Sequence, residues 1–196
     1  MKKFELTAEF VTNVFGKKLF RIKALVAFGD VEKGELGGFI EKEGNLSHDG
    51  DAWVSGNAWV YGNARVSGNA WVYGNARVSG NARVSGNAWV YGNARVSGNA
   101  QVSGNAQVSG DARVSGNADF SVVEGFGRYF RATTFFRCKD KILRVQCGCF
   151  YGDLAQFREI VKKTHGDSKY AKEYLAIADL MELHFSDEEE KQEAVE

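Results

Sequence analysis

Three cysteines and three histidines are the side chains of this sequence best suited to hold a metal ion. One glycine separates Cys147 from Cys149, so an extended strand would place both thiols on one face, with Cys138 on a hairpin partner. His165 could complete a zinc site with them. However, Cys-x-Cys differs from the two-residue gap of a zinc knuckle, and small buried cysteines are common in cores. We expect no metal, and Cys138, Cys147 and Cys149 are the candidates to check.

The histidines are also the candidates for a general base. His48, His165 and His184 are scattered, and none lies between residues 52 and 117. We expect His48 to be a hydrogen-bonded residue of a terminal cap, with a catalytic or ligand role as the alternative. The many serines lack a neighbouring base, and no Ser/His/Asp set, phosphate loop or carboxylate pair is present. The sequence therefore predicts no catalytic site, with His48 and His165 as the alternatives.

The elements that position these residues are dominated by a six-residue repeat. The unit Ala-x-Val-x-Gly-Asn runs eleven times from Ala52 to Asn117, with one Gly-Asp variant. Ala and Val lie two apart and share one face of an extended strand, while the x positions point the other way. Gly-Asn tolerates the left-handed backbone that a corner needs. The repeat predicts a β-helix solenoid with a continuous alanine and valine core.

These hexads resemble those of the hexapeptide-repeat family of left-handed parallel β-helices, in which three hexads form one coil of 18 residues. Many members are acyltransferases, which implies acetyl-CoA as a cofactor if the activity is kept. The chain is more similar to phage and prophage-type bacterial proteins named as transferases or polymer-forming proteins. The segments that carry this likeness are "LFRIKALVAFGDVEKGELGGFIEKEGNLS" and "GCFYGDLAQFREIVKKTHGDSKYAKEYL".

The family's catalytic features are not found in the repeats. Acyltransferases of this fold usually present a histidine base on a loop that interrupts the hexads, and the hexads here have neither an insertion nor a histidine. The carbonic-anhydrase branch needs three histidine ligands from neighbouring coils. We therefore expect no cofactor, and acyl transfer with His48 or His165 as base is the alternative.

An 18-residue coil sorts the variable positions into columns. One face of the prism then carries Trp53, Trp71 and Trp89, with Tyr73 and Tyr91 beside them. Adjacent coils lie about 4.8 Å apart, so these rings form an outward ladder of roughly several hundred Å², more than soluble monomers usually expose. We expect self-association or the chain's own terminal segments to cover it. Stacking of sugar rings or bases is the alternative.

Arginines occupy the other two faces. Arg77, Arg95 and Arg113 form one column, and Arg65 and Arg83 form another. Like charges at this spacing repel, so the guanidinium groups must be solvated, stacked, or paired with an anion. A solvated face that keeps the solenoid soluble is the favoured interpretation, and binding of a polyanion or glycan is the alternative.

The chain ends differ from the repeats. We expect an N-terminal β cap over residues 1–39, the β-helix over 40–121, a small α+β unit over 122–186 and a disordered acidic tail over 187–196. The inward positions of the first coil are predicted to be Ile40, Lys42, Leu46 and His48. In the α+β unit we expect strands with a turn near Lys139, a helix capped by Asp153 that ends near His165, and a second helix over 168–185.

Composition limits the function classes. Lys plus Arg equals Asp plus Glu at 25 each, so no charge excess favours nucleic acid. The N-terminal segment lacks an apolar signal region, no run of 18 apolar residues occurs, and the cysteines suit a reducing compartment, so a cytoplasmic location in a bacterial host is expected.

The first hypothesis is a non-enzymatic, homo-oligomeric scaffold of phage or prophage type, a dimer or a trimer. Its C-terminal unit would bind a protein partner, including a host or defence component. The alternatives are an acyl-CoA-dependent transferase and a polyanion or glycan binder.

Overall fold

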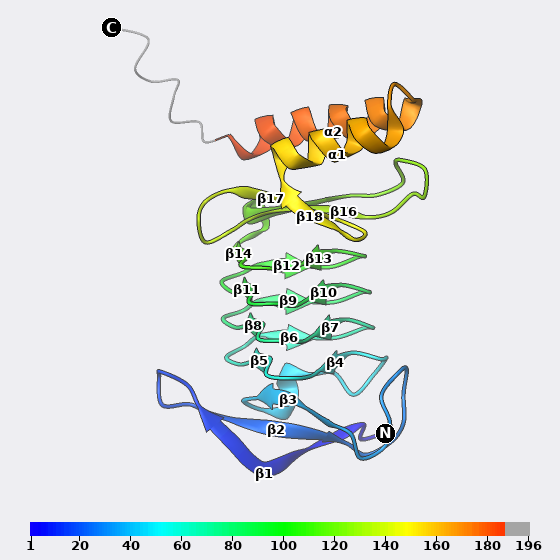
Figure 1. The fold of residues 1–196 in the computed structure, drawn as a ribbon. Coiled ribbons are helices and arrows are strands. Elements are labelled where there is room, and N and C mark those ends of the chain that lie inside the picture. The colour runs from blue at the N-terminus through cyan, green and yellow to red at the C-terminus, as the bar shows by residue number, and fades with distance from the viewer. Residues whose placement is uncertain (187–196) are drawn as a thin grey trace, which may run out of the picture.

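The computed structural model describes residues 1–186, and the predicted tail over 187–196 lies outside the described residues. The chain is mainly β (Figure 1). A β-solenoid of about four turns stands between an N-terminal antiparallel sheet and a C-terminal sheet that carries two helices. The fold class expected from the repeat, a β-helix with a cap and a small α+β unit, is confirmed.

Every hexad forms one two-residue strand. The eleven strands are β4 (Trp53–Val54), β5 (Trp59–Val60), β6 (Arg65–Val66), β7 (Trp71–Val72), β8 (Arg77–Val78), β9 (Arg83–Val84), β10 (Trp89–Val90), β11 (Arg95–Val96), β12 (Gln101–Val102), β13 (Gln107–Val108) and β14 (Arg113–Val114). They pair in parallel with partners 18 residues away, as between Trp53 and Trp71. The coil therefore contains three hexads, as expected.

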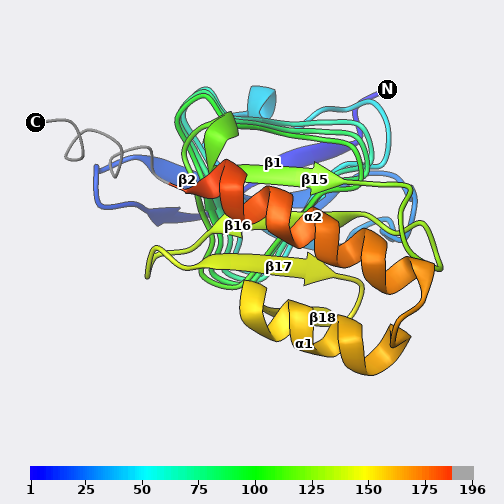
Figure 2. The ribbon, with the colours of Figure 1, turned by 90° about the horizontal axis from the view of Figure 1, so that it is seen from above.

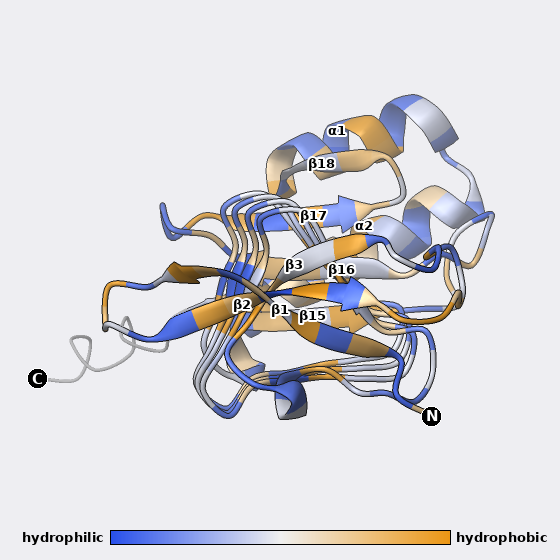
Figure 3. Cartoon of the chain, turned by 90° about the horizontal axis from the view of Figure 1, so that it is seen from below, coloured by the Kyte–Doolittle hydropathy of each residue, from blue (hydrophilic) through white to orange (hydrophobic). Residues whose placement is uncertain are grey.

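The coils stack through a core of small aliphatic side chains. The alanine and valine of each hexad are at most 1% exposed, and the coils superpose as a prism when seen along the axis (Figure 3). Glycine is required at the corners: Gly68 has φ +67°, and a Cβ there would lie 3.0 Å from the backbone nitrogen of Gly86. Corner asparagines add a ladder, in which the Asn69 amide donates to Asn87 Oδ1 at 3.1 Å.

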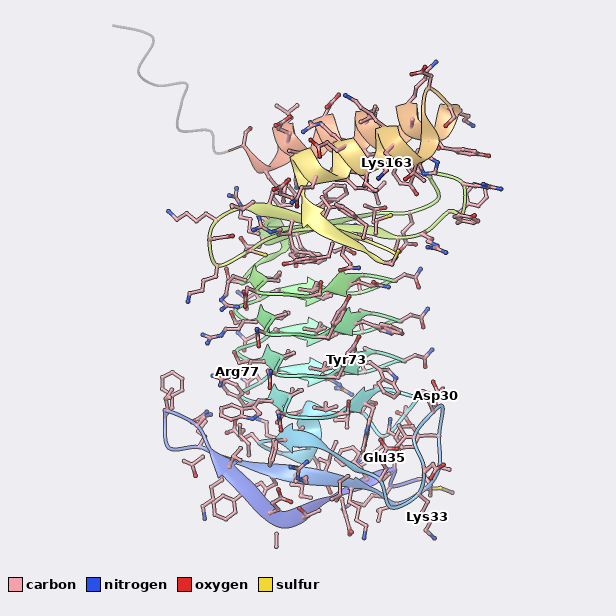
Figure 4. All side chains as sticks on the ribbon, in the orientation of Figure 1. Asp30, Lys33, Glu35, Tyr73, Arg77 and Lys163 are labelled. Atoms are coloured by element: carbon pink, nitrogen blue, oxygen red, sulfur yellow. The ribbon has the colours of Figure 1, made fainter. Side chains whose placement is uncertain are left out.

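The prism has three faces. The aromatic face consists of β4, β7, β10 and β13. The first arginine face consists of β5, β8, β11 and β14, and the second arginine face of β6, β9 and β12. Tyr73 and Arg77 project outward from different faces (Figure 4). Each face thus displays its own columns of variable side chains.

The N-terminal cap extends one face of the prism. It contains β1 (Phe4–Thr12), β2 (Lys18–Ala24) and β3 (Leu36–Ile40). The first two are antiparallel, and β3 pairs antiparallel with β2 and parallel with β5. The result is one seven-stranded sheet that continues into the first arginine face. The expected boundary at 39/40 therefore falls inside β3, which belongs to both parts.

The first coil departs from the hexad pattern. A 3₁₀ turn, η1 (Glu43–Asn45), replaces a corner, and the coil pairs 20 residues ahead, as between Phe39 and Trp59. Lys42 is exposed, so its predicted inward position is wrong. The buried polar residue is Asn45, whose amide donates to the carbonyls of Gly62 at 3.2 Å and Ala64 at 2.7 Å. With this turn, the side chain buried at the edge of the solenoid is the amide of Asn45 and not the ammonium of Lys42. The amide finds hydrogen-bond acceptors there in the backbone carbonyls of the next coil.

The C-terminal sheet closes the other end. After η2 (Asn117–Asp119) come β15 (Phe120–Val123), β16 (Thr133–Arg137), β17 (Leu143–Cys147) and β18 (Phe150–Asp153), all antiparallel. Successive residues of β16 face opposite ways: Phe136 enters the solenoid core and Phe135 packs under the helices. The expected boundary at 121/122 falls inside β15. The sheet is therefore the lid of the solenoid as well as the floor of the helical layer (Figure 2).

Two helices cover this sheet. α1 (Leu154–His165) begins at Asp153, which accepts from the backbone N–H of Gln156 at 2.8 Å, and Gly166 ends it. α2 (Lys169–Phe185) follows with Ser168 as its N-cap. Both helices start and end close to the positions predicted from the sequence. Neither of them, nor any other helix within residues 1–186, has the length and apolarity needed to cross a membrane.

Candidate functional site: the aromatic face

The aromatic face is built by the register of four strands. Trp53, Trp71, Trp89 and Gln107 follow one another in a single column, as the 18-residue period predicts. In the neighbouring column the rings of Tyr73 and Tyr91 stack with 4.9 Å between centroids and 1° between planes. Trp89 meets Tyr73 edge-on at 6.3 Å. Burial raises the pKa of Tyr73, so its hydroxyl stays protonated.

The chain itself covers both ends of this face. Trp53 is fully buried against the N-terminal cap, where the ring of Phe28 meets it edge-on at 5.4 Å. At the other end Gln107 donates its backbone N–H to Thr134 Oγ1 at 3.0 Å. Ser109 is buried and donates to Gln146 Oε1 at 3.0 Å. The C-terminal sheet therefore covers the last coil of the face.

The uncovered part is the middle of the face. It consists of Trp71, Trp89, Tyr73 and Tyr91, and Trp89 is 44% exposed. Beyond Tyr91, a hollow of about 400 Å³ continues under the turn between β17 and β18, lined by Tyr151 and Cys149 among others. Burial raises the pKa of Tyr151 to about 12. This surface presents aromatic rings and neutral hydroxyl groups, with no charged side chain in its columns.

The arginine columns lie on the other faces, as predicted. The guanidinium of Arg77 stacks on Trp59 at 4.3 Å, and Arg113 donates to three backbone carbonyls, those of Asn93, Asp111 and Ala112. Arg65, Arg83 and Arg95 are exposed. Arg65 and Arg83 line a polar groove of about 670 Å³ on the second arginine face, together with Lys42 and several serines.

The histidines are held by structural contacts. His48 Nδ1 accepts from the backbone N–H of Lys3 at 3.2 Å, and its ring stacks on Phe4 at 4.3 Å. His165 lies at the far end of the molecule, where its ring packs near Tyr174 at 5.9 Å. No carboxylate orients either ring among the described contacts. The geometry brings neither histidine to the aromatic face.

The cysteines do not form a cluster. Cys147 and Phe150 are paired, so Cys149 lies in the two-residue turn with Gly148, and the prediction that it shares a strand face with Cys147 is wrong. Gly148 adopts φ +58°, which allows this tight turn. Cys138 follows β16, whereas Cys147 pairs with Thr133 at the opposite end of that strand. Within residues 1–186 no three His, Cys, Asp or Glu side chains gather in a way that could hold a metal ion.

Sequence reasoning missed the contribution of the C-terminal sheet to this surface. Tyr151 and Gln146 reach the last coil from β18 and β17, far from the repeats in sequence. The alternation of hydrophobic and polar residues in a short strand does not show which side chains face the solenoid and which face the helices. The hexads also do not predict how the C-terminal sheet is placed across the end of the solenoid.

Fold and repeat define the chain as a β-solenoid repeat protein. A model of the YdcK beta-solenoid repeat matches residues 58–74, 76–92, 88–104 and 106–118, which lie in the hexapeptide run except for the last residue. No curated protein matches the chain. The hexapeptide run is therefore similar to this solenoid repeat, while the terminal units lie outside the match.

Proposed function

We propose that this protein is a non-enzymatic scaffold that pairs with a second copy of itself through the middle of the aromatic face. The observation that supports the proposal is that the chain leaves Trp89 exposed and Trp71, Tyr73 and Tyr91 half-buried, with no segment of residues 1–186 over them. The chain buries Trp53, at the end of the same column, under its own cap. Partly exposed aromatic rings carry a large hydrophobic and stacking energy that a partner surface can recover.

A second copy is the occupant that the charges favour. The columns of the aromatic face contain no charged residue, so two such faces meet without repulsion. The other two faces carry five arginines, and two copies of either would bring like charges together. A second copy can therefore pack against the aromatic face without charge repulsion, whereas packing through either arginine face would bring like charges together.

The geometry favours a dimer over a trimer. A patch that meets itself is related by a two-fold axis, whereas a cyclic trimer needs two different, complementary patches on each copy. The neutral aromatic surface is a single continuous patch on one face. The proposed assembly is therefore a two-fold dimer, in which the rigid solenoids fix the separation of two C-terminal units.

Those units offer a surface for a protein partner. The helical layer leaves apolar side chains exposed, with Leu180 at 56% and Leu183 at 71%, in addition to Ile160 and Tyr170. Such side chains on the outer helices favour a protein partner over a small ligand. The hypothesis that the partner is a host or defence protein in a phage setting derives from the family resemblance and belongs to this proposal.

The test is the native mass of the protein by light scattering at several concentrations. The wild type is expected to be a dimer, and the variant with Trp71→Arg and Trp89→Arg a folded monomer. A matched control carries Arg65→Glu and Arg83→Glu, two equally drastic changes on another face, and is expected to stay dimeric. A monomeric wild type, or a control that dissociates as the tryptophan variant does, would refute the proposal.

The same samples separate this function from acyl transfer. Acetyl-CoA is expected to leave the melting temperature of the wild type unchanged. A shift that disappears in His48→Ala or His165→Ala would instead favour an acyltransferase.

A further inference from the structure

The C-terminal unit contains a second hollow, a pocket lined mainly by apolar side chains. It lies between α1, α2, the turn that joins β17 and β18, and the loop that joins β15 and β16, and its volume is about 210 Å³. The loop, residues 124–132, rises beside the connection between the two helices (Figures 1 and 2). Four segments that are distant in sequence therefore meet at this pocket.

Aromatic rings form the walls of the pocket. The ring of Phe157 meets that of Phe150 at 5.6 Å and that of Tyr174 edge-on at 5.8 Å. The ring of His165 lies over Tyr174 at 5.9 Å, and Val161 completes the apolar lining. Within residues 1–186, no acidic side chain lines the pocket. Walls of this kind suit a flat ring, which packs on aromatic neighbours by stacking and by edge-to-face contact.

Two arginines stand at the mouth of the pocket. The guanidinium groups of Arg131 and Arg128 lie 5.0 and 5.5 Å from the centre of the Tyr129 ring. Arg131 Nη1 also lies over the turn between β17 and β18, where a Cβ on Gly148 would come within 2.7 Å of it. Among the described residues, neither arginine has a carboxylate partner. Two cations without a counter-charge beside an apolar pocket favour an anion.

The charge of Arg131 reaches the floor of the pocket. Burial raises the pKa of Tyr174 to about 12, and the charge of Arg131 acts against this rise, so its guanidinium lies near the hydroxyl. Glu173 also lies near Tyr174, but its carboxylate accepts from the backbone N–H of Gly127 at 2.9 Å and pairs with Lys169 at 3.4 Å. The carboxylate of Glu173 therefore anchors the base of the loop.

The loop backbone is held in an uncommon conformation. Gly127 packs so closely on Tyr174 that a Cβ would overlap its ring, which fixes one end of the arginine-bearing segment. Phe130 adopts φ +53°, a left-handed conformation that residues other than glycine seldom adopt. Its ring is 70% exposed, so the strain does not serve to bury this side chain. Strain of this kind is typical of binding sites, and here it lies between the two arginines.

The size of the pocket limits the ligand. An apolar cavity of about 150 Å³ holds one benzene molecule. The volume of about 210 Å³ therefore accommodates one ring with a short acidic group and is too small for a nucleotide. An acid without a ring would leave the aromatic walls in water. A neutral ring would leave the two arginines without a counter-charge.

We propose that this pocket binds a small aromatic carboxylate, whose ring lies against Phe157 and Tyr174 and whose carboxylate pairs with Arg131 and Arg128. The ring displaces water from the apolar walls. The carboxylate accepts charge-assisted hydrogen bonds from a guanidinium group, the strongest kind that an arginine forms. This ligand site lies beneath the helical layer, and its test does not depend on the aromatic dimer.

Fluorine NMR of 4-fluorobenzoate with the full-length protein tests the site. A ligand of about ten non-hydrogen atoms should bind with a Kd at or below about 1 mM. 4-Fluorobenzyl alcohol keeps the ring and lacks the charge, and it should bind about tenfold more weakly because hydrogen bonds to a charged group are lost. Acetate keeps the charge and lacks the ring, and an equal concentration of it should not displace 4-fluorobenzoate.

Two variants and a control locate the bound ring. Arg131→Gln removes the charge beside Tyr174 and should weaken the binding of 4-fluorobenzoate by about tenfold, with no change for the alcohol. Thr164→Trp, at an exposed position of the pocket lining, should obstruct the pocket and weaken the binding of both compounds. The matched control Arg65→Gln removes the same charge from the second arginine face and should leave binding unchanged. Circular dichroism checks that each variant is folded.

Four results would overturn the inference. The first is the absence of binding of 4-fluorobenzoate at millimolar concentration. The second is equal affinity for 4-fluorobenzyl alcohol, and the third is displacement by an equal concentration of acetate. The fourth is binding that persists in both Arg131→Gln and Thr164→Trp, because the ring would then lie elsewhere on the molecule.

Discussion

Two tryptophans of one column should respond very differently to the same substitution. Trp53 and Trp89 occupy equivalent hexad positions and have similar local sequences. Trp53 is fully buried beneath the N-terminal cap, whereas Trp89 is 44% exposed. We compare Trp53→Ala with Trp89→Ala, which serves as the matched control because the residue types, strand position and face are identical.

The structure sets the magnitudes. Trp53→Ala leaves a cavity between the coil and the cap, because Phe28 and the backbone of Gly37 pack on the indole ring. Such large-to-small changes in a core cost about 3–5 kcal/mol. Trp89→Ala removes a ring that is nearly half solvated and leaves no enclosed cavity, so the expected loss in the monomer is about 1 kcal/mol. The two losses should differ by at least about 2 kcal/mol.

Urea unfolding followed by far-ultraviolet circular dichroism measures both losses, at a protein concentration low enough for the monomer to dominate. With a slope near 2 kcal/mol per molar urea, the midpoint should fall by about 1.5–2.5 M for Trp53→Ala and about 0.5 M for Trp89→Ala. Equal shifts would show that the cap does not pack on Trp53 as described. The conclusion that the N-terminal cap covers this end of the aromatic face would then be wrong.

Three further changes test the caps and the coils. Burial lowers the pKa of Lys3 from 10.5 to about 8, so the folded chain releases this proton first. The free energy of unfolding should therefore rise by about 2 kcal/mol from pH 7 to 9.5 relative to Lys3→Met, and a constant difference in urea unfolding would contradict this. Asn45→Ala removes three hydrogen bonds of a buried amide, two donated to the carbonyls of Gly62 and Ala64 and one accepted from the backbone N–H of Lys42. It should cost about 1–3 kcal/mol by urea unfolding, against about 0.5 kcal/mol or less for the exposed Asn63→Ala, and similar losses would refute the role of η1. Gly86→Ala and Gly16→Ala both place a side chain at positive φ, but only at Gly86 would the Cβ lie against backbone, 2.9 Å from the Gly104 nitrogen. Gly16→Ala should cost about 1 kcal/mol and Gly86→Ala at least about 2 kcal/mol in the same assay, and equal costs would exclude coil contact as the reason for the corner glycines.

The solenoid could be predicted almost residue by residue because its geometry repeats. The inward and outward alternation within a hexad, the glycine corner and the 18-residue coil follow from local rules that are the same in each unit. Once the coil length is known, the neighbour of Trp71 must be Trp89. The helix boundaries near Asp153 and Gly166 were also predictable, since capping is local.

The terminal units could be predicted only in part because they depend on contacts between distant segments. The burial of Trp53 depends on Phe28 and Gly37, which reach it only after the cap folds back over the coil. The place of Cys149 in a turn depends on the pairing of Cys147 with Phe150. From the sequence alone, the segment from Cys147 to Cys149 fits a single continuous strand as well as it fits a strand end followed by a two-residue turn.

The difference between the repeated coils and the terminal units also explains where the candidate site lies. The core determines the alanine and valine positions of each hexad, and the corner determines the glycine, so only the outward positions are free to carry recognition. At the first and last coils these outward positions are used to hold the caps, as Trp53 and Ser109 show. On the aromatic face, the outward side chains that hold neither cap are therefore those of the middle coils. The aromatic pairs on β7 and β10 lie in that region, where a ring contributes little to holding the monomer together and remains available to a partner.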